Sequence, residues 1–255
     1  MSTFLWDRIV FGPIHSRRVG NSLGINLLST RAKTCSFNCI YCECGDIVVL
    51  DARIPSFQDV ASAMNARFEE LFNEGVQIDS ISFTGNGEPT IHPDFAAIID
   101  KTIELRDKYF PSAVISVFSN SNSLDKQSVF DALLKIDNRI MKIDCCDESI
   151  IKLINRPNCN YSLEHTIENL ERFKGDFILQ TIFFKCEIAG QQIDLTSPEL
   201  VDGWYKMVRR LRPSKIMAYT IDRETPTSGF QKISKDQLLQ IAAPLIDEGF
   251  TVEVS

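Results

Sequence analysis

The chain has 255 residues, a net charge of −7 and a pI near 5.1, so it presents no overall positive field that would attract nucleic acid. Its 44% apolar content suffices for a sizeable core, and no apolar run approaches the roughly 18 residues of a membrane span. The N-terminus carries an acid and lacks the basic-then-apolar pattern of a signal peptide. We therefore expect a cytoplasmic protein with reduced cysteines and no membrane partner.

Short apolar runs alternate with helical patterns along the chain, which is typical of parallel βαβ units. The expected strands are residues 23–28, 79–83, 113–118, 140–143, 177–184 and 215–219, with a short terminal strand at 251–254. The expected helices are residues 57–73, 94–108, 123–135, 147–173 with a break near Pro157, 198–211 and 235–248. Six parallel strands are too few for a closed eight-stranded barrel. We predict one α/β domain over residues 1–255, folded as a partial, open (β/α)6 TIM-like barrel; a doubly wound sheet is the alternative.

The most informative segment, CSFNCIYC, follows the first expected strand and places Cys35, Cys39 and Cys42 at C-x3-C-x2-C spacing on one loop. Structural zinc usually takes four ligands, commonly as two pairs of cysteines. The nearest additional thiol, Cys44, lies on the same turn and could hardly complete a tetrahedron. Soft thiolates also suit iron–sulfur clusters, and three of them on a cubane leave one iron open to a substrate or cofactor. The spacing therefore favours a cluster over zinc.

These residues resemble the signature of the radical S-adenosylmethionine (SAM) superfamily, CxxxCxxC after the first barrel strand. The resemblance implies that Cys35, Cys39 and Cys42 hold a [4Fe-4S] cluster whose open iron is chelated by the amino and carboxylate groups of SAM. An electron from the reduced cluster would cleave SAM, and the resulting 5′-deoxyadenosyl radical would abstract hydrogen from a substrate. The resemblance also implies that Tyr41 lies against the adenine of SAM, with a packing role as the alternative.

A second segment, FTGNGEPTIHP, follows the next expected strand. Gly85 and Gly87 flank Asn86 and permit close approach of the backbone to a ligand, and Glu88 and Pro89 fix the exit of the turn. The segment resembles the GGEP segment of the same superfamily, which binds the SAM amino group largely through its backbone, although here Asn86 is interposed. By this resemblance Gly85, Gly87, Glu88 and Pro89 bind SAM. An ordinary strand-to-helix turn is the alternative.

Polar residues follow the later expected strands, and the carboxyl ends of barrel strands share one mouth. By resemblance, Asn120 and Asp144 are candidates for contacts with the ribose or carboxylate of SAM. Arg156 and Arg223 could orient an anionic group, or could form ion pairs within the protein. Further polar residues at these strand ends are Ser119, Lys185, Glu187, Thr220 and Asp222.

Longer segments resemble the radical SAM group related to the wyosine (tricyclic guanosine) synthases of tRNA. They are FGPIHSRRVGNSLGINLL, FTGNGEPTIHPDF, IDCCDESIIKLINRP and YTIDRETP. The wyosine synthases carry three further cysteines upstream for a second cluster, with a lysine among them. This chain has no Cys before Cys35 and no Lys before Lys33, which argues against wyosine-base formation. The substrate is thus open, and a nucleoside or RNA base is compatible with the resemblance but not supported by the charge.

An external low-potential electron donor, flavodoxin or ferredoxin, is also implied, and the cluster should be sensitive to oxygen because one iron lacks a protein thiolate. The alternative hypothesis is an iron–sulfur protein that transfers electrons or serves as a scaffold without cleaving SAM. That hypothesis predicts a fourth cluster ligand, with Cys44 as the candidate. The remaining cysteines form no second ligand triplet and are interpreted as buried free thiols: Cys145, Cys146, Cys159 and Cys186.

Overall fold

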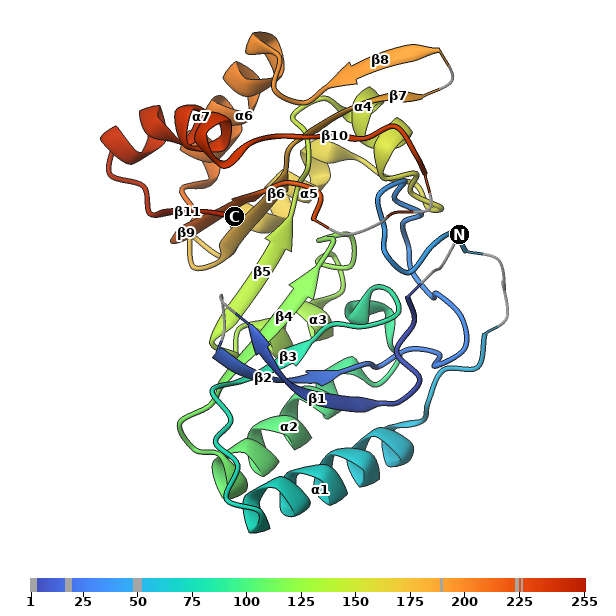
Figure 1. Ribbon diagram of the computed structural model, residues 1–255. Coiled ribbons are helices and arrows are strands. Elements are labelled where there is room, and N and C mark those ends of the chain that lie inside the picture. The colour runs from blue at the N-terminus through green and yellow to red at the C-terminus, as the bar shows by residue number, and fades with distance from the viewer. Residues whose placement is uncertain (1–3, 17–19, 48–51, 189, 223–224, 226) are drawn as a thin grey trace.

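An open eight-stranded sheet with strand order β1-β2-β3-β4-β5-β6-β9-β11 forms the centre of the structure (Figure 1). The computed structural model describes residues 4–16, 20–47, 52–188, 190–222, 225 and 227–255. The strands of the sheet are β1 (Val10–Ser16), β2 (Gly20–Ile25), β3 (Ser80–Phe83), β4 (Val114–Ser119), β5 (Asn138–Lys142), β6 (Ile178–Ile182), β9 (Lys215–Tyr219) and β11 (Val252–Val254). The helices are α1 (Phe57–Asn73), α2 (Phe95–Tyr109), α3 (Gln127–Leu133), α4 (Glu148–Ile154), α5 (Leu163–Glu171), α6 (Pro198–Leu211), α7 (Lys235–Asp247) and the short 3-10 helix η1 (Pro89–Ile91).

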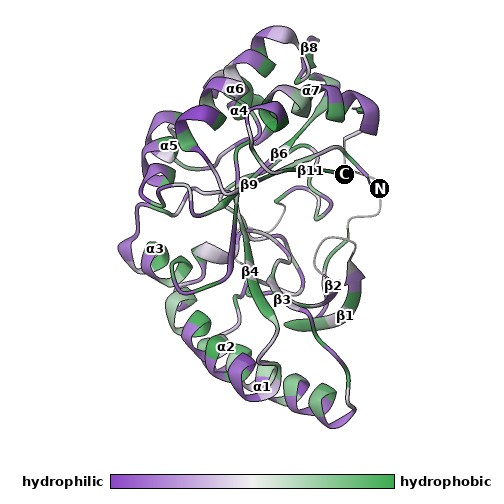
Figure 2. Ribbon diagram, turned by 90° about the vertical axis from the view of Figure 1, so that its left-hand side faces the viewer, coloured by the Kyte–Doolittle hydropathy of each residue, from purple (hydrophilic) through white to green (hydrophobic). Residues whose placement is uncertain are grey.

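Within this eight-stranded sheet, all strands except β1 run parallel to one another. Strand β1 lies antiparallel to β2 at one edge. The helices lie on the convex side of the curved sheet (Figure 2). A doubly wound sheet would carry helices on both faces, so that alternative is wrong. The predicted partial, open (β/α)6 barrel is confirmed, with β1 and β11 added at its two edges.

Helix α1 shows how local sequence sets the boundaries of these elements. Ser56 and Asp59 form a capping box: the Ser56 hydroxyl accepts from the Asp59 N–H at 3.2 Å, and the Asp59 carboxylate accepts from the Ser56 N–H at 2.9 Å. Apolar residues then recur at helical spacing and face the core. They are Val60, Ala61, Met64, Phe68 and Leu71. The predicted helix over residues 57–73 is confirmed at both ends.

The first expected strand, residues 23–28, begins and ends three residues earlier as β2, and two further differences change the topology. Strand β1 was missed because its Gly12–Pro13 pair interrupts the strand pattern; the structure places a register irregularity there, between Phe11 and Ile14. The expected strand 177–184 is in fact two elements, because the chain leaves the main sheet after β6. It continues as β7 (Phe184–Ile188), which pairs with β8 (Gln191–Asp194) and β10 (Gln231–Lys232) in a separate three-stranded sheet.

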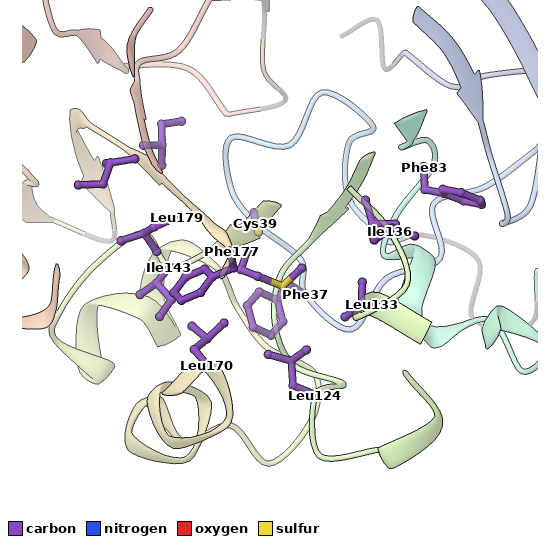
Figure 3. Packing of buried hydrophobic residues seen from close by; sticks show 14 of the residues in the cluster. Phe37, Cys39, Phe83, Leu124, Leu133, Ile136, Ile143, Leu170, Phe177 and Leu179 are labelled. Atoms are coloured by element: carbon purple, nitrogen blue, oxygen red, sulfur yellow. The ribbon is translucent and has the colours of Figure 1, made fainter. Parts of the chain in front are cut away.

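The hydrophobic core extends from the sheet into the cysteine loop. Phe37 and Cys39 of this loop are 4% and 8% exposed and belong to the main core cluster (Figure 3). The Phe37 ring also packs edge-on against Tyr161, with ring centroids 5.4 Å apart. Burying one large apolar side chain contributes about 1.5–3 kcal/mol, so the core itself holds the loop in place. Within the described residues, no helix is long and apolar enough to cross a membrane.

Candidate functional site

The loop that carries the three cysteines follows β2 and is held from two sides. On one side Thr34 pairs with Gly87 in a parallel bridge, and its N–H donates to the Asn86 carbonyl at 2.8 Å. On the other side Phe37 pairs with Pro157 in an antiparallel bridge. The loop is therefore clamped between the GNGEP turn after β3 and the segment that follows α4.

Hydrogen-bond donors converge on the cysteine sulfurs. Cys35 Sγ accepts from the Phe37 N–H at 3.4 Å and from the Asn120 side chain at 3.8 Å. Cys39 Sγ accepts from the Asn155 side chain at 3.3 Å. Donors of this kind stabilise thiolate charge, and hydrogen bonds to sulfur tune the potential of iron–sulfur clusters.

The environments of the thiols shift their pKa values in opposite directions. Burial, followed by the nearby Glu88 carboxylate, raises the pKa of Cys35 to about 12. A hydrogen bond from the Cys44 thiol, aided by the Lys33 ammonium, lowers the pKa of Cys42 to about 6. Cys42 is thus more acidic, and Cys35 less acidic, than an ordinary cysteine. Binding of a metal centre by all three would release protons.

The donor set fits an iron–sulfur cluster better than a single metal ion. Among the described residues, no three His, Cys, Asp or Glu side chains are close enough to hold one ion. A cubane does not require such proximity, because each thiolate binds a different iron. The fourth-ligand candidate, Cys44, is hydrogen-bonded to Cys42 and directs its thiol to the Gly85 carbonyl at 3.5 Å. The assignment of the three thiols as ligands of such a cluster remains a prediction.

The two glycines of the GNGEP turn are required by contacts within the protein. Gly87 has a φ of +144°, and a Cβ there would lie 1.7 Å from the Thr34 carbonyl oxygen. A Cβ on Gly85 would lie 2.4 Å from the Asn26 side-chain oxygen. The turn therefore makes its close approach to the cysteine loop and to the end of β2.

The interposed Asn86 has its own structural task. Its side chain is fully buried; it accepts from the Trp6 N–H and donates to the Trp6 and Ser29 carbonyls, all at 2.8 Å. Paired acceptance and donation of this kind imitates a strand partner. Asn86 thereby fixes the N-terminal segment onto the turn, where the Trp6 ring stacks on Phe11 at 3.6 Å between centroids.

The Glu88 carboxylate is 3% exposed and is fully engaged inside the protein. One oxygen accepts from the Thr90 N–H at 3.1 Å and the Thr90 hydroxyl at 2.6 Å, and the other accepts from the Asn120 N–H at 2.6 Å. Burial raises the pKa of Glu88, although these hydrogen bonds oppose the shift. Glu88 therefore joins the turn to the end of β4, and Pro89 begins the short helix η1.

A buried polar network lies beside Cys39. Tyr41 donates its hydroxyl proton to Asp144 Oδ2, and Lys142 donates to both the Tyr41 hydroxyl and Asp144 Oδ2, the latter at 2.8 Å. Asn155 donates to the same carboxylate oxygen at 2.6 Å and to the Tyr41 hydroxyl at 2.8 Å. The Lys142 ammonium also lies 3.8 Å from Cys39 Sγ. The network thus couples the expected adenine contact, Tyr41, to a thiol of the cysteine triplet.

The surroundings of this network raise the pKa values of two of its members, Tyr41 and Lys142. Burial raises the pKa of Tyr41 well above its ordinary value, and the Asp144 carboxylate adds to the shift. Burial opposes the charge of Lys142, but Asp144 and Cys39 raise its pKa well above the ordinary value. Asp144 Oδ2 accepts three hydrogen bonds, whereas the buried Oδ1 has no partner. An ionised carboxylate only accepts, so a ligand that satisfies Oδ1 must offer an N–H or O–H group.

Residues 30–183 match the model of the Radical SAM superfamily. The chain belongs to this superfamily. Its members are enzymes that use a [4Fe-4S] cluster and SAM.

Two relatives match most of the length of this chain. The protein named GTPase Obg of Brachyspira hyodysenteriae is 28% identical over 250 residues, which is 96% of this chain and 34% of the relative. A UPF0026 protein of Methanocaldococcus jannaschii is 33% identical over 181 residues, which is 68% of this chain and 53% of the relative. The chain thus spans about a third and about half of the length of these two relatives.

Solved structures share the fold at low sequence identity. A radical SAM methyltransferase from Sphaerobacter thermophilus has a TM-score of 0.68 at 13% identity, covering 92% of this chain and 65% of that one. The enzyme anSMEcpe with bound AdoMet has a TM-score of 0.59 at 16% identity, covering 91% of this chain and 63% of that one. These likenesses show that the fold is that of radical SAM enzymes.

The structure brings together most of the residues expected from the radical SAM motifs. Asn120 lies one residue past β4, with its side-chain N–H groups directed to Ser36 Oγ at 2.9 Å and to Cys35. Asp144 lies two residues past β5, beside Tyr41. Ser119 adds a hydrogen bond to the Glu88 carboxylate. Their assignment as SAM contacts remains a prediction.

Other expected residues lie elsewhere. Lys185 forms an ion pair with Asp194 at 2.8 Å in the three-stranded sheet, and the Thr220 hydroxyl accepts from the Ile233 N–H at 3.0 Å. Glu187, Asp222 and Arg156 are exposed. Arg223 lies outside the described residues. The interpretation of four cysteines as buried thiols holds for Cys145 and Cys186, but Cys146 is partly exposed and Cys159 is exposed.

Three residues of the site were not singled out from the sequence: Lys33, Lys142 and Asn155. Lys142 sits in an apolar strand, and Asn155 precedes the arginine of the NRP motif that drew attention instead. A charged residue within a buried strand, two positions before an aspartate, was the available signal for Lys142. Asn155 carried no comparable signal, because its role depends on a fold contact with Cys39, 116 positions away.

Proposed function

We propose that this chain is a radical SAM enzyme in which Cys35, Cys39 and Cys42 hold a [4Fe-4S] cluster. The observation that supports the proposal most directly is the clamped cysteine loop, lying against the GNGEP turn on one side and beside the Tyr41–Asp144 pair on the other. The chemistry supplied by the bound cofactors would be reductive cleavage of SAM to a 5′-deoxyadenosyl radical, followed by hydrogen abstraction from a substrate.

Different residues around the cysteines would contact different parts of SAM. Gly85, Gly87, Glu88 and Pro89 would offer backbone groups of the turn to the amino end of SAM. Asp144 Oδ1, buried and without a partner, would accept from a ribose hydroxyl or from the ammonium group. The carboxylate of SAM would be repelled by Asp144, so of the two contacts expected at this residue the ribose is favoured.

Tyr41 and Asn120 would act differently from each other. The Tyr41 hydroxyl is fully engaged by Asp144, Lys142 and Asn155, which leaves only its ring to lie against the adenine. The Asn120 side chain already donates to Cys35 and Ser36, so its effect on SAM would pass mainly through the position of the cysteine loop.

The experiment is anaerobic reconstitution with iron and sulfide, followed by addition of dithionite and SAM. The expected result is about four irons per chain, with 5′-deoxyadenosine and methionine formed from SAM. Replacement of Cys35, Cys39 or Cys42 by Ala should abolish both. An intact cluster that yields no 5′-deoxyadenosine would contradict the proposal.

One pair of variants separates the proposal from the electron-transfer alternative. Cys44→Ala should leave cluster content and SAM cleavage intact, because Cys44 is proposed to bind no iron. Under the alternative, Cys44 is the fourth ligand and its loss should destroy the cluster. Cys159→Ala is the matched control, since it removes one exposed thiol outside the triplet.

The substrate class rests on the longer segments that resemble the wyosine-synthase group. They make a nucleoside or RNA base the first class to test, although the net charge of −7 gives no support for binding to an RNA backbone. Flavodoxin or ferredoxin would serve as electron donor in the cytoplasm, and exposure to air should degrade the cluster because one iron lacks a thiolate. Cleavage of SAM driven by reduced flavodoxin in place of dithionite would test the donor.

A further inference from the structure

Lys33 is a buried lysine inside the cysteine loop, two residues before Cys35. Lys33 is 2% exposed. Its ammonium donates to the Gly45 carbonyl at 2.9 Å and to the Asn38 side-chain oxygen at 3.1 Å. Both acceptors are neutral. The ion pairs formed by lysines in the described part of the chain all involve other lysines, such as Lys142 with Asp144.

A buried ammonium without a carboxylate partner is costly unless another anion compensates it. The nearest candidates are the thiols of the same loop. Asn38 and Gly45, the two acceptors of the ammonium, lie on either side of Cys39 and Cys42 in the sequence and anchor it within the loop that carries all three thiols.

We propose that Lys33 is the built-in counter-charge of the cysteine site, stabilising the anionic cluster and setting its reduction potential. The inference rests on the proposed function, since it requires a cluster on the three thiolates. Each added electron makes the cluster more negative, so a fixed cation nearby favours the reduced form. Burial keeps salt and water from screening this interaction.

The test compares midpoint potentials of the reconstituted full chain by redox titration followed by electron paramagnetic resonance. Lys33→Met removes the charge but keeps an unbranched side chain in the buried space. At a fixed potential, the reduced-to-oxidised ratio should fall about tenfold or more, which is a shift of about 59 mV for one electron. Arg31→Gln is the matched control: it removes a positive charge from an exposed residue of the same loop, and should change the ratio less than twofold.

Asn38→Asp provides a second variant in which Lys33 stays in place. A carboxylate would then replace the neutral oxygen that accepts from the ammonium at 3.1 Å, and would neutralise it. This variant should shift the potential in the same negative direction as Lys33→Met, and if Lys33→Met takes up no cluster, an unchanged potential in Asn38→Asp overturns the inference.

A role for Lys33 that is purely structural would leave the potential of a loaded Lys33→Met chain unchanged. Midpoints of Lys33→Met and Asn38→Asp within twofold of the wild-type ratio would therefore overturn the inference. Iron content and 5′-deoxyadenosine formation of the wild-type chain are measured in parallel. Failure of the wild type in those measurements would contradict the proposed function, whereas an unchanged potential in active variants contradicts only the role of Lys33.

Discussion

Replacement of Gly87 by Ala should damage the contact between the GNGEP turn and the cysteine loop. The added Cβ would lie 1.7 Å from the Thr34 carbonyl oxygen, a backbone atom that cannot rotate away. The φ of +144° is also a conformation that L residues rarely adopt. The turn and the loop must therefore move apart, and Cys35, next to Thr34, moves with the loop.

The expected cost has three parts. Backbone strain at this φ costs about 1–3 kcal/mol. Forced displacement of packed neighbours costs about 1–3 kcal/mol. Weakening of the hydrogen bonds that Thr34 makes with Asn86 and Glu88, at 2.8 and 3.2 Å, costs about 0.5–1.5 kcal/mol each. The sum of about 3–9 kcal/mol is a large fraction of the free energy of unfolding of a typical domain.

Gly75→Ala is the matched control. Gly75 also has a positive φ, +72°, but nothing lies within 4 Å of the position that a Cβ would take. Its cost is strain alone, about 1–2 kcal/mol. Urea unfolding of both variants gives the stability difference, and iron content after reconstitution reports on the site. If Gly87→Ala is as stable as Gly75→Ala and loads a full cluster, the tight contact with Thr34 is unimportant and the reasoning is wrong.

Three further substitutions probe the scaffold of the site. Asp147→Ala removes the N-cap of α4 and should cost about 1 kcal/mol at pH 7. Hydrogen bonds from the Ser149 side chain and from the first turn lower the pKa of Asp147. The stability that its carboxylate contributes is therefore present above the ordinary carboxyl pKa and is lost as pH falls through the lowered folded value. Urea unfolding between about pH 5 and pH 2 should show that the difference in stability between variant and wild type vanishes. Trp204→Phe removes the hydrogen bond from Nε1 to the Thr181 hydroxyl at 3.1 Å and should cost about 1–2 kcal/mol by thermal unfolding. Asn86→Ala removes three buried hydrogen bonds and should cost about 3 kcal/mol, with increased proteolysis of the N-terminal segment.

Each of these expectations has a contrary result. A pH-independent effect of Asp147→Ala would show that the carboxylate charge does not stabilise the helix end. A loss above about 4 kcal/mol in Trp204→Phe would mean that the Thr181 hydroxyl, which also donates to the Ile143 carbonyl at 2.8 Å, depends on the indole for its position. Unchanged proteolysis in Asn86→Ala would show that the segment is held by its aromatic contacts instead.

Much of the fold could be predicted because local signals and tertiary packing agree in the βα units. Helix α1 has a capping box at its start and a clear apolar face, and strand β9 is a short apolar run that packs as expected. Strand β1 could not be predicted, since Gly12–Pro13 interrupts it and its pairing with β2 compensates. The small sheet of β7, β8 and β10 likewise depends on pairing between distant segments that carry no strong pattern of their own.

In the candidate site, too, contiguous motifs could be predicted from the sequence, whereas contacts between distant positions could not. The cysteine triplet and the GNGEP turn are each contiguous, so their spacing alone points to a cluster and a cofactor turn. Lys142 and Asn155 act on Tyr41 and Cys39 across more than 100 positions, and a single sequence gives no sign of such contacts. Lys33 lies close in sequence, but only the structure shows that it is buried and lacks an acidic partner in the described chain.

The double clamp on the cysteine loop also determines when the site can exist during synthesis. Thr34 needs Gly87, more than 50 positions later, and Phe37 needs Pro157, 120 positions later. A growing chain therefore exposes its thiols long before the segments that immobilise them have left the ribosome. During that interval Cys35, Cys39 and Cys42 are three unrestrained thiols, open to oxidation and to any thiophilic metal. We expect iron delivery to be most selective after at least the first 157 residues, through Pro157, have folded.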